Sequence, residues 1–216
     1  MKTRVKILGL TRAEDVACAL EHGASFLGFI VEAASKRRLS VNAAAKLSVP
    51  ARGLAQIVAV TVNADDTLLT RIMAQMTPDY IQCHGDETPN RVAEIAARFN
   101  VKTIKACAVA SDSDMKTAET YVGAADFILF DAKPPTESDV RGGHGLKIDW
   151  DMIARAPQPK VFALAGGLTP QNAAEAATKT RAPILDVSSG VERAPGVKDP
   201  EKIKAFMNAV VQSKPL

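Results

Sequence analysis

Two glycine-bearing turns near the C-terminal end of the sequence could bind an anion. They are "LAGGLTPQN" (164–172) and "DVSSGVE" (186–192), and each begins as a short apolar run ends. Where glycine leaves no Cβ in the way, backbone N–H groups can converge on a phosphate, and a following helix start adds positive charge. The alternative is that the glycines only permit tight turns. We expect a sugar-phosphate site, because no long nucleotide-binding motif accompanies the turns. Its residues would be Gly166, Gly167, Ser188, Ser189 and Gly190.

Asp131 could act as an acid, because it ends the apolar run "DFILFD" (126–131). A carboxylic acid donates a proton near neutral pH only if its pKa is raised, and a partly dry pocket can raise it. The alternative is a loop-start carboxylate that accepts hydrogen bonds from nearby N–H groups. Leu8 ends the first apolar run, "RVKIL" (4–8), and can neither take nor give a proton.

Short apolar runs with β-strand character recur along the chain and must position these residues. They are 4–8, 26–31, 55–62, 80–83, 101–107, 126–131, 160–165 and 184–189.

Helical stretches separate the runs. One helix is expected to begin at Thr11 and another at Pro89. Thr169-Pro170 and Asp199-Pro200 read as a helix cap followed by the first helical residue.

The alternation of strand and helix predicts an α/β fold with parallel strands, because parallel strands need long crossover connections. Eight units favour a single (β/α)₈ TIM barrel over residues 1–216. An open doubly wound sheet is the structural alternative. Its dinucleotide-binding form would need GxGxxG after the first strand, and "LGLTRAED" has a single glycine.

Composition excludes several classes of function. The chain has 27 basic and 24 acidic residues, which is too balanced for a nucleic-acid binder. Three scattered cysteines indicate reduced thiols rather than disulfides or a zinc site, and so a cytoplasmic protein. The N-terminal stretch lacks the apolar core expected of a signal peptide, and no apolar run approaches the length needed to span a membrane.

Six motifs in register give the whole chain a resemblance to phosphoribosylanthranilate isomerase. "VKILGLT" resembles the family's VKICGLT, and "GASFLGFI" with "SKRRLS" resembles GAxxLGFVF…SPRxxS. "IQCHGDE" is similar to VQLHGDE, and "LFDAKPP…GGHG…IDW" to LLDAK…GGTG…FDW. "LAGGLTPQN" and "DVSSGVE" match almost letter for letter.

The resemblance implies an Amadori rearrangement of N-(5-phosphoribosyl)anthranilate in tryptophan biosynthesis, without metal or organic cofactor. Asp131 would be the general acid that opens the ribose ring. The family's general base is the cysteine of KICG, where this chain has Leu8. The leucine could be an engineered or selected substitution, the activity could be lost, or another group could have taken over. His84, His144 and Cys107 are the candidates for that group.

The resemblance also implies substrate contacts. Arg37 would bind the anthranilate carboxylate, since a guanidinium fork suits a planar carboxylate. Asp186 would lie at the rim near the substrate's amino group, and Gln82 and His84 should face the same way.

The expected partner is therefore a phosphorylated small molecule bound by a monomer. Two other functions stay open: a sugar-phosphate-binding barrel without catalysis, and an isomerase of another aminoaldose phosphate. The latter usually pairs two aspartates at strands one and five, where Leu8 and Cys107 lie here.

Overall fold

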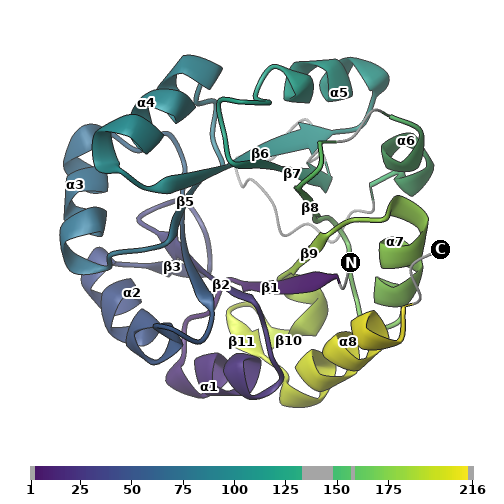
Figure 1. Ribbon diagram of the computed structural model, residues 1–216. Coiled ribbons are helices and arrows are strands. Elements are labelled where there is room, and N and C mark those ends of the chain that lie inside the picture. The colour runs from purple at the N-terminus through teal and green to yellow at the C-terminus, as the bar shows by residue number, and fades with distance from the viewer. Residues whose placement is uncertain (1–2, 133–147, 157–158, 214–216) are drawn as a thin grey trace.

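Parallel strands form a closed ring inside a ring of helices (Figure 1), in a computed structural model that describes residues 3–132, 148–156 and 159–213. The eight barrel strands are β1 (Arg4–Leu8), β2 (Phe26–Val31), β4 (Gln56–Thr61), β5 (Tyr80–Cys83), β6 (Lys102–Val109), β7 (Phe127–Ala132), β8 (Phe162–Leu164) and β9 (Ile184–Val187).

The first strand closes the barrel, because it pairs with β2 on one side and with β9 on the other. Leu8 lies opposite Gly28, and Lys6 lies opposite Asp186. Every pairing in the ring is parallel, so all carboxyl ends lie at one end of the barrel. The predicted (β/α)₈ barrel is confirmed, and the open sheet is excluded.

Helices cover the outside of the ring. In the described part of the chain they are α1 (Ala13–Glu21), α2 (Val41–Ser48), α3 (Asp66–Gln75), α4 (Pro89–Phe99), α5 (Asp112–Glu119), α6 (Trp150–Arg155), α7 (Ala173–Thr180) and α8 (Pro200–Gln212). Short 3₁₀ turns, η1 (Val49–Ala51) and η2 (Ser189–Val191), accompany them. None of the described helices is long and apolar enough to cross a membrane.

Two of the predicted helix starts are confirmed. Pro89 and Pro200 are first residues of α4 and α8, capped by the side chains of Thr88 and Asp199. The prediction for Thr169-Pro170 is wrong, because α7 begins at Ala173.

Asn172 is the reason for the late start of α7. Its Oδ1 accepts from the Thr169 N–H at 2.8 Å, and its Nδ2 donates to the Gly167 carbonyl at 2.9 Å. These side-chain bonds hold residues 167–172 in a turn that competes with helix.

Three short strands lie outside the ring and were absent from the prediction. β3 (Arg38–Leu39) pairs with the last residues of β2, so the chain after β2 returns to the carboxyl end of the barrel. β10 (Glu192–Ala194) and β11 (Val197–Lys198) form a small antiparallel pair directly after β9.

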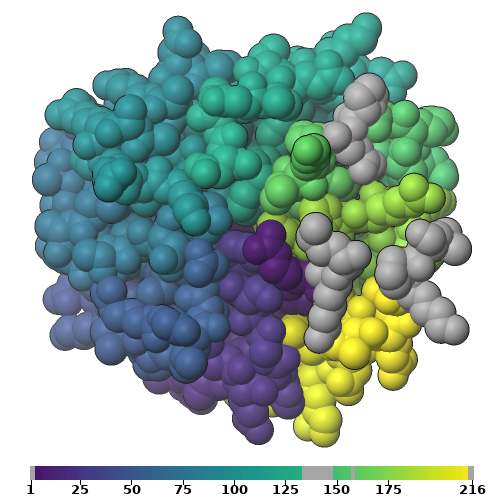
Figure 2. Space-filling view, viewed as in Figure 1, coloured from purple at the N-terminus to yellow at the C-terminus, as the bar shows by residue number. Residues whose placement is uncertain are grey.

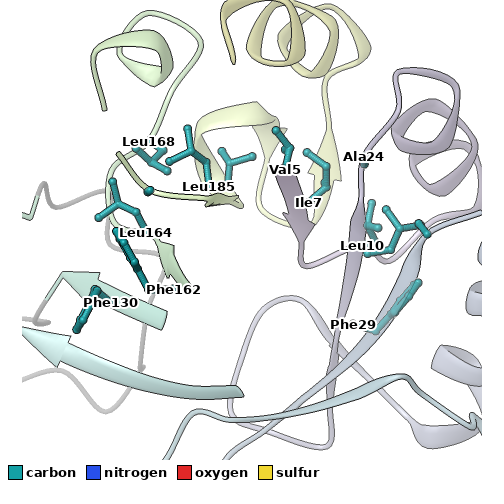
Figure 3. Close-up of a cluster of buried hydrophobic side chains, with 14 of the residues drawn as sticks. Val5, Ile7, Leu10, Ala24, Phe29, Phe130, Phe162, Leu164, Leu168 and Leu185 are labelled. Atoms are coloured by element: carbon teal, nitrogen blue, oxygen red, sulfur yellow. The ribbon is translucent and has the colours of Figure 1, made fainter. Parts of the chain in front are cut away.

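The apolar core has two layers, as strand alternation requires. Side chains such as Val5, Ile7 and Phe29 point outward toward the helices (Figure 3). Side chains of the opposite parity fill the barrel, and Figure 2 shows no open channel through the middle of the face in view.

Three aromatic rings pack inside the barrel near the amino ends of their strands. Phe26, Tyr80 and Phe127 lie edge to face, with centroids 5.6 to 6.2 Å apart. Since these rings fill the lower part of the barrel, the polar inward residues lie toward the carboxyl ends.

Candidate functional site

Leu8 points into the barrel and belongs to the apolar packing of its interior. A Cβ built on Gly28 would lie 2.9 Å from the Leu8 Cδ1, so the leucine lies flat against the glycine of the neighbouring strand. Lys6, of the same parity, is fully buried one layer deeper. Both side chains therefore face the interior of the barrel.

Asp131 and His84 approach each other at the carboxyl end of the barrel. The His84 Nε2 lies 3.6 Å from the Asp131 Oδ2, and both side chains are largely buried. The other carboxylate oxygen, Oδ1, accepts from the N–H of Ala132 at 2.8 Å. Asp131 therefore has the local hydrogen bond of a loop-start carboxylate and also faces a second titratable group.

A buried polar chain leads from His84 to the opposite side of the barrel. The His84 Nδ1 is 2.9 Å from the Gln82 Nε2, and the Gln82 Oε1 accepts from the Lys6 Nζ at 2.7 Å. The Lys6 Nζ also donates to Asp186 Oδ2 at 2.8 Å. Gln82 and His84 thus face the same way, as predicted, and Cys83 packs outward.

Asp186 lies deeper than the rim position predicted from the sequence, because only 4% of it is exposed. Burial raises the pKa of its carboxyl group, and the nearby Lys6 opposes this effect. Its Oδ1 has no hydrogen-bond partner within the described residues.

A second buried cluster joins three loops at the same end of the barrel. The Arg37 Nε and Nη2 donate to the two oxygens of Glu192 at 2.8 and 2.7 Å. The Lys198 Nζ donates to the Glu192 Oε1 at 2.8 Å, to the Leu8 carbonyl at 2.6 Å and to the Ser188 carbonyl at 3.1 Å.

Burial sets the titration of this cluster. It lowers the pKa of Lys198 to about 8, although Glu192 acts in the opposite direction. Burial also tends to raise the pKa of Glu192, but Arg37 and Lys198 outweigh it, so the net shift is downward. Glu192 is therefore held as a carboxylate between two cations.

Glycine makes room for Arg37. A Cβ on Gly9 would lie 2.4 Å from the Arg37 Cδ, so the arginine crosses directly over the end of β1. β3 holds the chain there, because it pairs with the end of β2 next to β1. Arg37 was predicted to bind a substrate carboxylate, and here two of its nitrogens hold Glu192, which leaves Nη1 outside that pair of bonds.

The two glycine turns meet at this end of the barrel. Gly166 and Gly167 have φ of +86° and +63°, which favours glycine. A Cβ on Gly190 would lie 1.8 Å from the Leu168 carbonyl oxygen, so the turn after β9 packs against the turn after β8. Within the described residues, the N–H groups of Gly167, Ser189 and Gly190 donate to no backbone carbonyl. These N–H groups are available to an anion.

One candidate for a substitute base, Cys107, does not reach this site. Cys107 packs in the layer between barrel and helices, so it does not face the pocket as a substitute base would have to. Burial raises the pKa of its thiol to about 11, which leaves little thiolate at neutral pH. His144 lies outside the described residues, as does most of the stretch between β7 and α6.

The comparisons with known proteins agree with this geometry. The family model for N-(5'-phosphoribosyl)anthranilate (PRA) isomerase matches residues 5–209. The chain belongs to this family.

Individual relatives extend the match over nearly the whole chain. PRA isomerase of Caulobacter vibrioides is 47% identical over 210 residues, which are 97% of this chain and 96% of that protein. The protein of the same name from Rhizobium rhizogenes is 44% identical over 213 residues, 99% of this chain and 96% of its own.

Solved PRA isomerase structures have the same fold. The Thermotoga maritima enzyme superposes with a TM-score of 0.87 at 33% identity, covering 96% of this chain and 98% of its own. Another structure, in complex with reduced 1-(o-carboxyphenylamino)-1-deoxyribulose 5-phosphate, has a TM-score of 0.82 at 32% identity and covers 96% of this chain and 98% of its own.

Sequence reasoning missed two members of the buried cluster around Arg37. Glu192 is the last letter of the turn motif "DVSSGVE", so its position was visible but its partner was not. Lys198 carries no local signal, because its contacts depend on how β11 folds back over the end of β1.

Proposed function

We propose that the protein converts N-(5'-phosphoribosyl)anthranilate to 1-(o-carboxyphenylamino)-1-deoxyribulose 5-phosphate, at a rate reduced by Leu8. The observation that carries the proposal is the inward position of Asp131, beside His84, at the end of the barrel where the two glycine turns meet. Membership of the PRA isomerase family supports the substrate, and so does the product-analogue complex of a solved relative.

The substrate is oriented by its charged groups. Its phosphate binds at the two turns that carry Gly166, Gly167, Ser188, Ser189 and Gly190, through N–H groups such as those of Gly167, Ser189 and Gly190. Its carboxylate pairs with Arg37, through the nitrogen that Glu192 leaves available. Asp186, Gln82 and His84 border the sugar from below.

The reaction begins when Asp131 protonates the ribose ring oxygen. The C1–O bond breaks, and the anthranilate nitrogen forms a Schiff base with C1. A proton then leaves C2, which gives an enolamine that tautomerises to the ketone. Leu8 stands where the family has its base, and a missing general base costs about 10²–10⁴ in rate. In this chain the C2 proton passes to water.

Product analysis in deuterated buffer tests the proposal. The chain is expected to form the deoxyribulose phosphate with solvent deuterium at C1, because the proton of C2 passes to water and C1 takes up a proton from solvent as the enolamine becomes the C2 ketone. Unchanged substrate after prolonged incubation at high enzyme concentration would contradict catalysis.

A sugar-phosphate-binding barrel without catalysis is the second candidate, favoured by Leu8 itself beside intact glycine turns. Calorimetric titration with the reduced product analogue separates the two: heat of binding without turnover selects the second candidate. The isomerase of another aminoaldose phosphate has less support, because Cys107 points away from the site.

We also infer that the chain acts as a monomer in the cytoplasm. Its three cysteines are free thiols. The large exposed hydrophobic residues of the described chain lie in four stretches of the sequence, with two of them in and just after η1: Val49 and Leu54, then Val122, Val161 and Val211. Light scattering after size exclusion tests the monomer, and a mass near twice 22.9 kDa would contradict it.

A further inference from the structure

The amide of Gln82 has only one orientation that its surroundings allow. The Lys6 ammonium carries donors and no acceptor, so the atom 2.7 Å from it must be the Gln82 oxygen. The Lys6 Nζ also donates to the Asp186 Oδ2 at 2.8 Å in this fully buried place. The Gln82 NH₂ group therefore points the other way, toward His84.

This orientation fixes the tautomer of His84. The Gln82 Nε2 lies 2.9 Å from the His84 Nδ1 and can only donate, so Nδ1 must present its lone pair. The proton of the neutral imidazole is then on Nε2. That nitrogen is the one that lies 3.6 Å from the Asp131 Oδ2.

We propose that Lys6 and Gln82 are positioning residues that hold His84 as the Nε2–H tautomer, with its N–H directed at Asp131. This role rests on the proposed function, in which Asp131 is the acid. Lys6 and Gln82 act through His84 and Asp131, and neither needs to touch the substrate.

The tautomer decides where the proton of Asp131 goes. An Nε2 lone pair facing the carboxyl group would compete with the substrate's ring oxygen for that proton. An Nε2–H cannot accept it, and it stabilises the Asp131 carboxylate that forms as the ring opens. A small closing movement brings the 3.6 Å separation to hydrogen-bond distance.

The same arrangement argues against His84 as the substitute for the missing base. The only lone pair of its neutral ring faces Gln82, away from the pocket. A proton arriving at Nδ1 would meet the Gln82 NH₂ group, donor against donor.

Nitrogen NMR of the ligand-free protein tests the tautomer directly. The chain has only three histidines, so ¹⁵N-histidine labelling gives few signals, and His84→Gln identifies those of His84 by their loss. A long-range proton–nitrogen spectrum of the wild-type protein should show a protonated Nε2 and an unprotonated Nδ1. A protonated Nδ1 would overturn the proposal, whatever the turnover is.

Gln82→Glu tests the effect on catalysis, since it keeps the size and the bond to Lys6 but replaces the donor with an acceptor. We expect His84 to move its proton to Nδ1, and kcat to fall about tenfold with KM within about twofold, as for a lost transition-state donor. Thr103→Val is the control, because it changes a buried hydroxyl on the adjacent strand without touching His84. Its spectrum and kcat should stay at wild-type values.

The kinetics can be measured in the Leu8→Cys background if wild-type turnover is slow. An unchanged kcat despite a reversed tautomer would contradict the positioning role. The wild-type tautomer without turnover, even with cysteine at position 8, would contradict the proposed function instead.

Discussion

The Nζ of Lys198 donates to the main-chain carbonyl of Leu8 at 2.6 Å. This bond holds the end of β1 through its backbone, so the position of residue 8 does not depend on its side chain. A cysteine placed there would point into the barrel as the leucine does.

Leu8→Cys should therefore raise kcat by about 10²–10⁴, the usual contribution of a general base. Steady-state turnover of phosphoribosylanthranilate measures it. Leu8→Ser is the control, because it relieves the same apolar packing but adds a group that is a poor base. An equal gain in both variants would mean that space, not proton transfer, limits the rate.

Gly190→Ala should weaken phosphate binding. Its Cβ would lie 1.8 Å from the Leu168 carbonyl oxygen, so the turns after β8 and β9 must move apart and their N–H groups diverge. Loss of charge-assisted hydrogen bonds of this kind should weaken binding about tenfold or more.

Calorimetric titration with inorganic phosphate measures this effect. Gly123→Ala is the control, since a Cβ there meets nothing within 4 Å and only strains a φ of +86°. Equal affinity of both variants would exclude the two turns as the phosphate site.

Arg37→Lys should raise KM for the substrate about tenfold and change kcat less than about threefold, because lysine loses the planar fork that engages Glu192 and a ligand carboxylate together. The exposed neighbour Arg38, changed to lysine, is the control. If Arg38→Lys raised KM as much, the effect would come from general basic charge on the loop.

The buried thiol of Cys83 should make the free energy of unfolding depend on pH, in a direction that follows from its pKa. Burial raises the pKa of its thiol from 9.0 to about 12, so above pH 9 the unfolded chain loses this proton before the folded protein does. The free energy of unfolding should therefore fall as pH rises, by about 1 kcal/mol between pH 8 and pH 10.

Urea unfolding of wild type and Cys83→Ala measures the contribution as a difference. The effects of Lys198 and of other alkaline groups are common to both proteins and cancel. The difference in free energy of unfolding between wild type and Cys83→Ala should become smaller by that amount as pH rises. If the free energies of the two proteins changed in parallel with pH, the effect of burial on the thiol would be contradicted.

Much of the barrel was predictable because most of its strands coincide with short apolar runs in the sequence. The runs at 4–8, 26–31 and 80–83 coincide with β1, β2 and β5 residue for residue. The run at 160–165 was too long at both ends, and the left-handed Gly166 and Gly167 account only for its carboxyl end, where they turn the chain away from β8.

The site was predictable only where it follows from strand alternation. The inward direction of Lys6, Leu8, Gln82 and His84 follows from period two along β1 and β5. The ion pair between Arg37 and Glu192 joins residues 155 positions apart in the sequence, and no local sequence pattern predicts it. The outward direction of Cys107 follows from alternation with the inward Ala106, which was not used in the prediction.

Turnover of phosphoribosylanthranilate by the wild-type chain and by Asp131→Asn tests the central claim most directly. Asparagine keeps the Oδ1 that accepts from Ala132, and Asp126→Asn, at the other end of β7, controls for loss of a carboxylate. The account predicts slow but measurable wild-type turnover, a loss of about 10² or more in Asp131→Asn, and little change in Asp126→Asn. A wild-type rate equal to that of Asp131→Asn would contradict it.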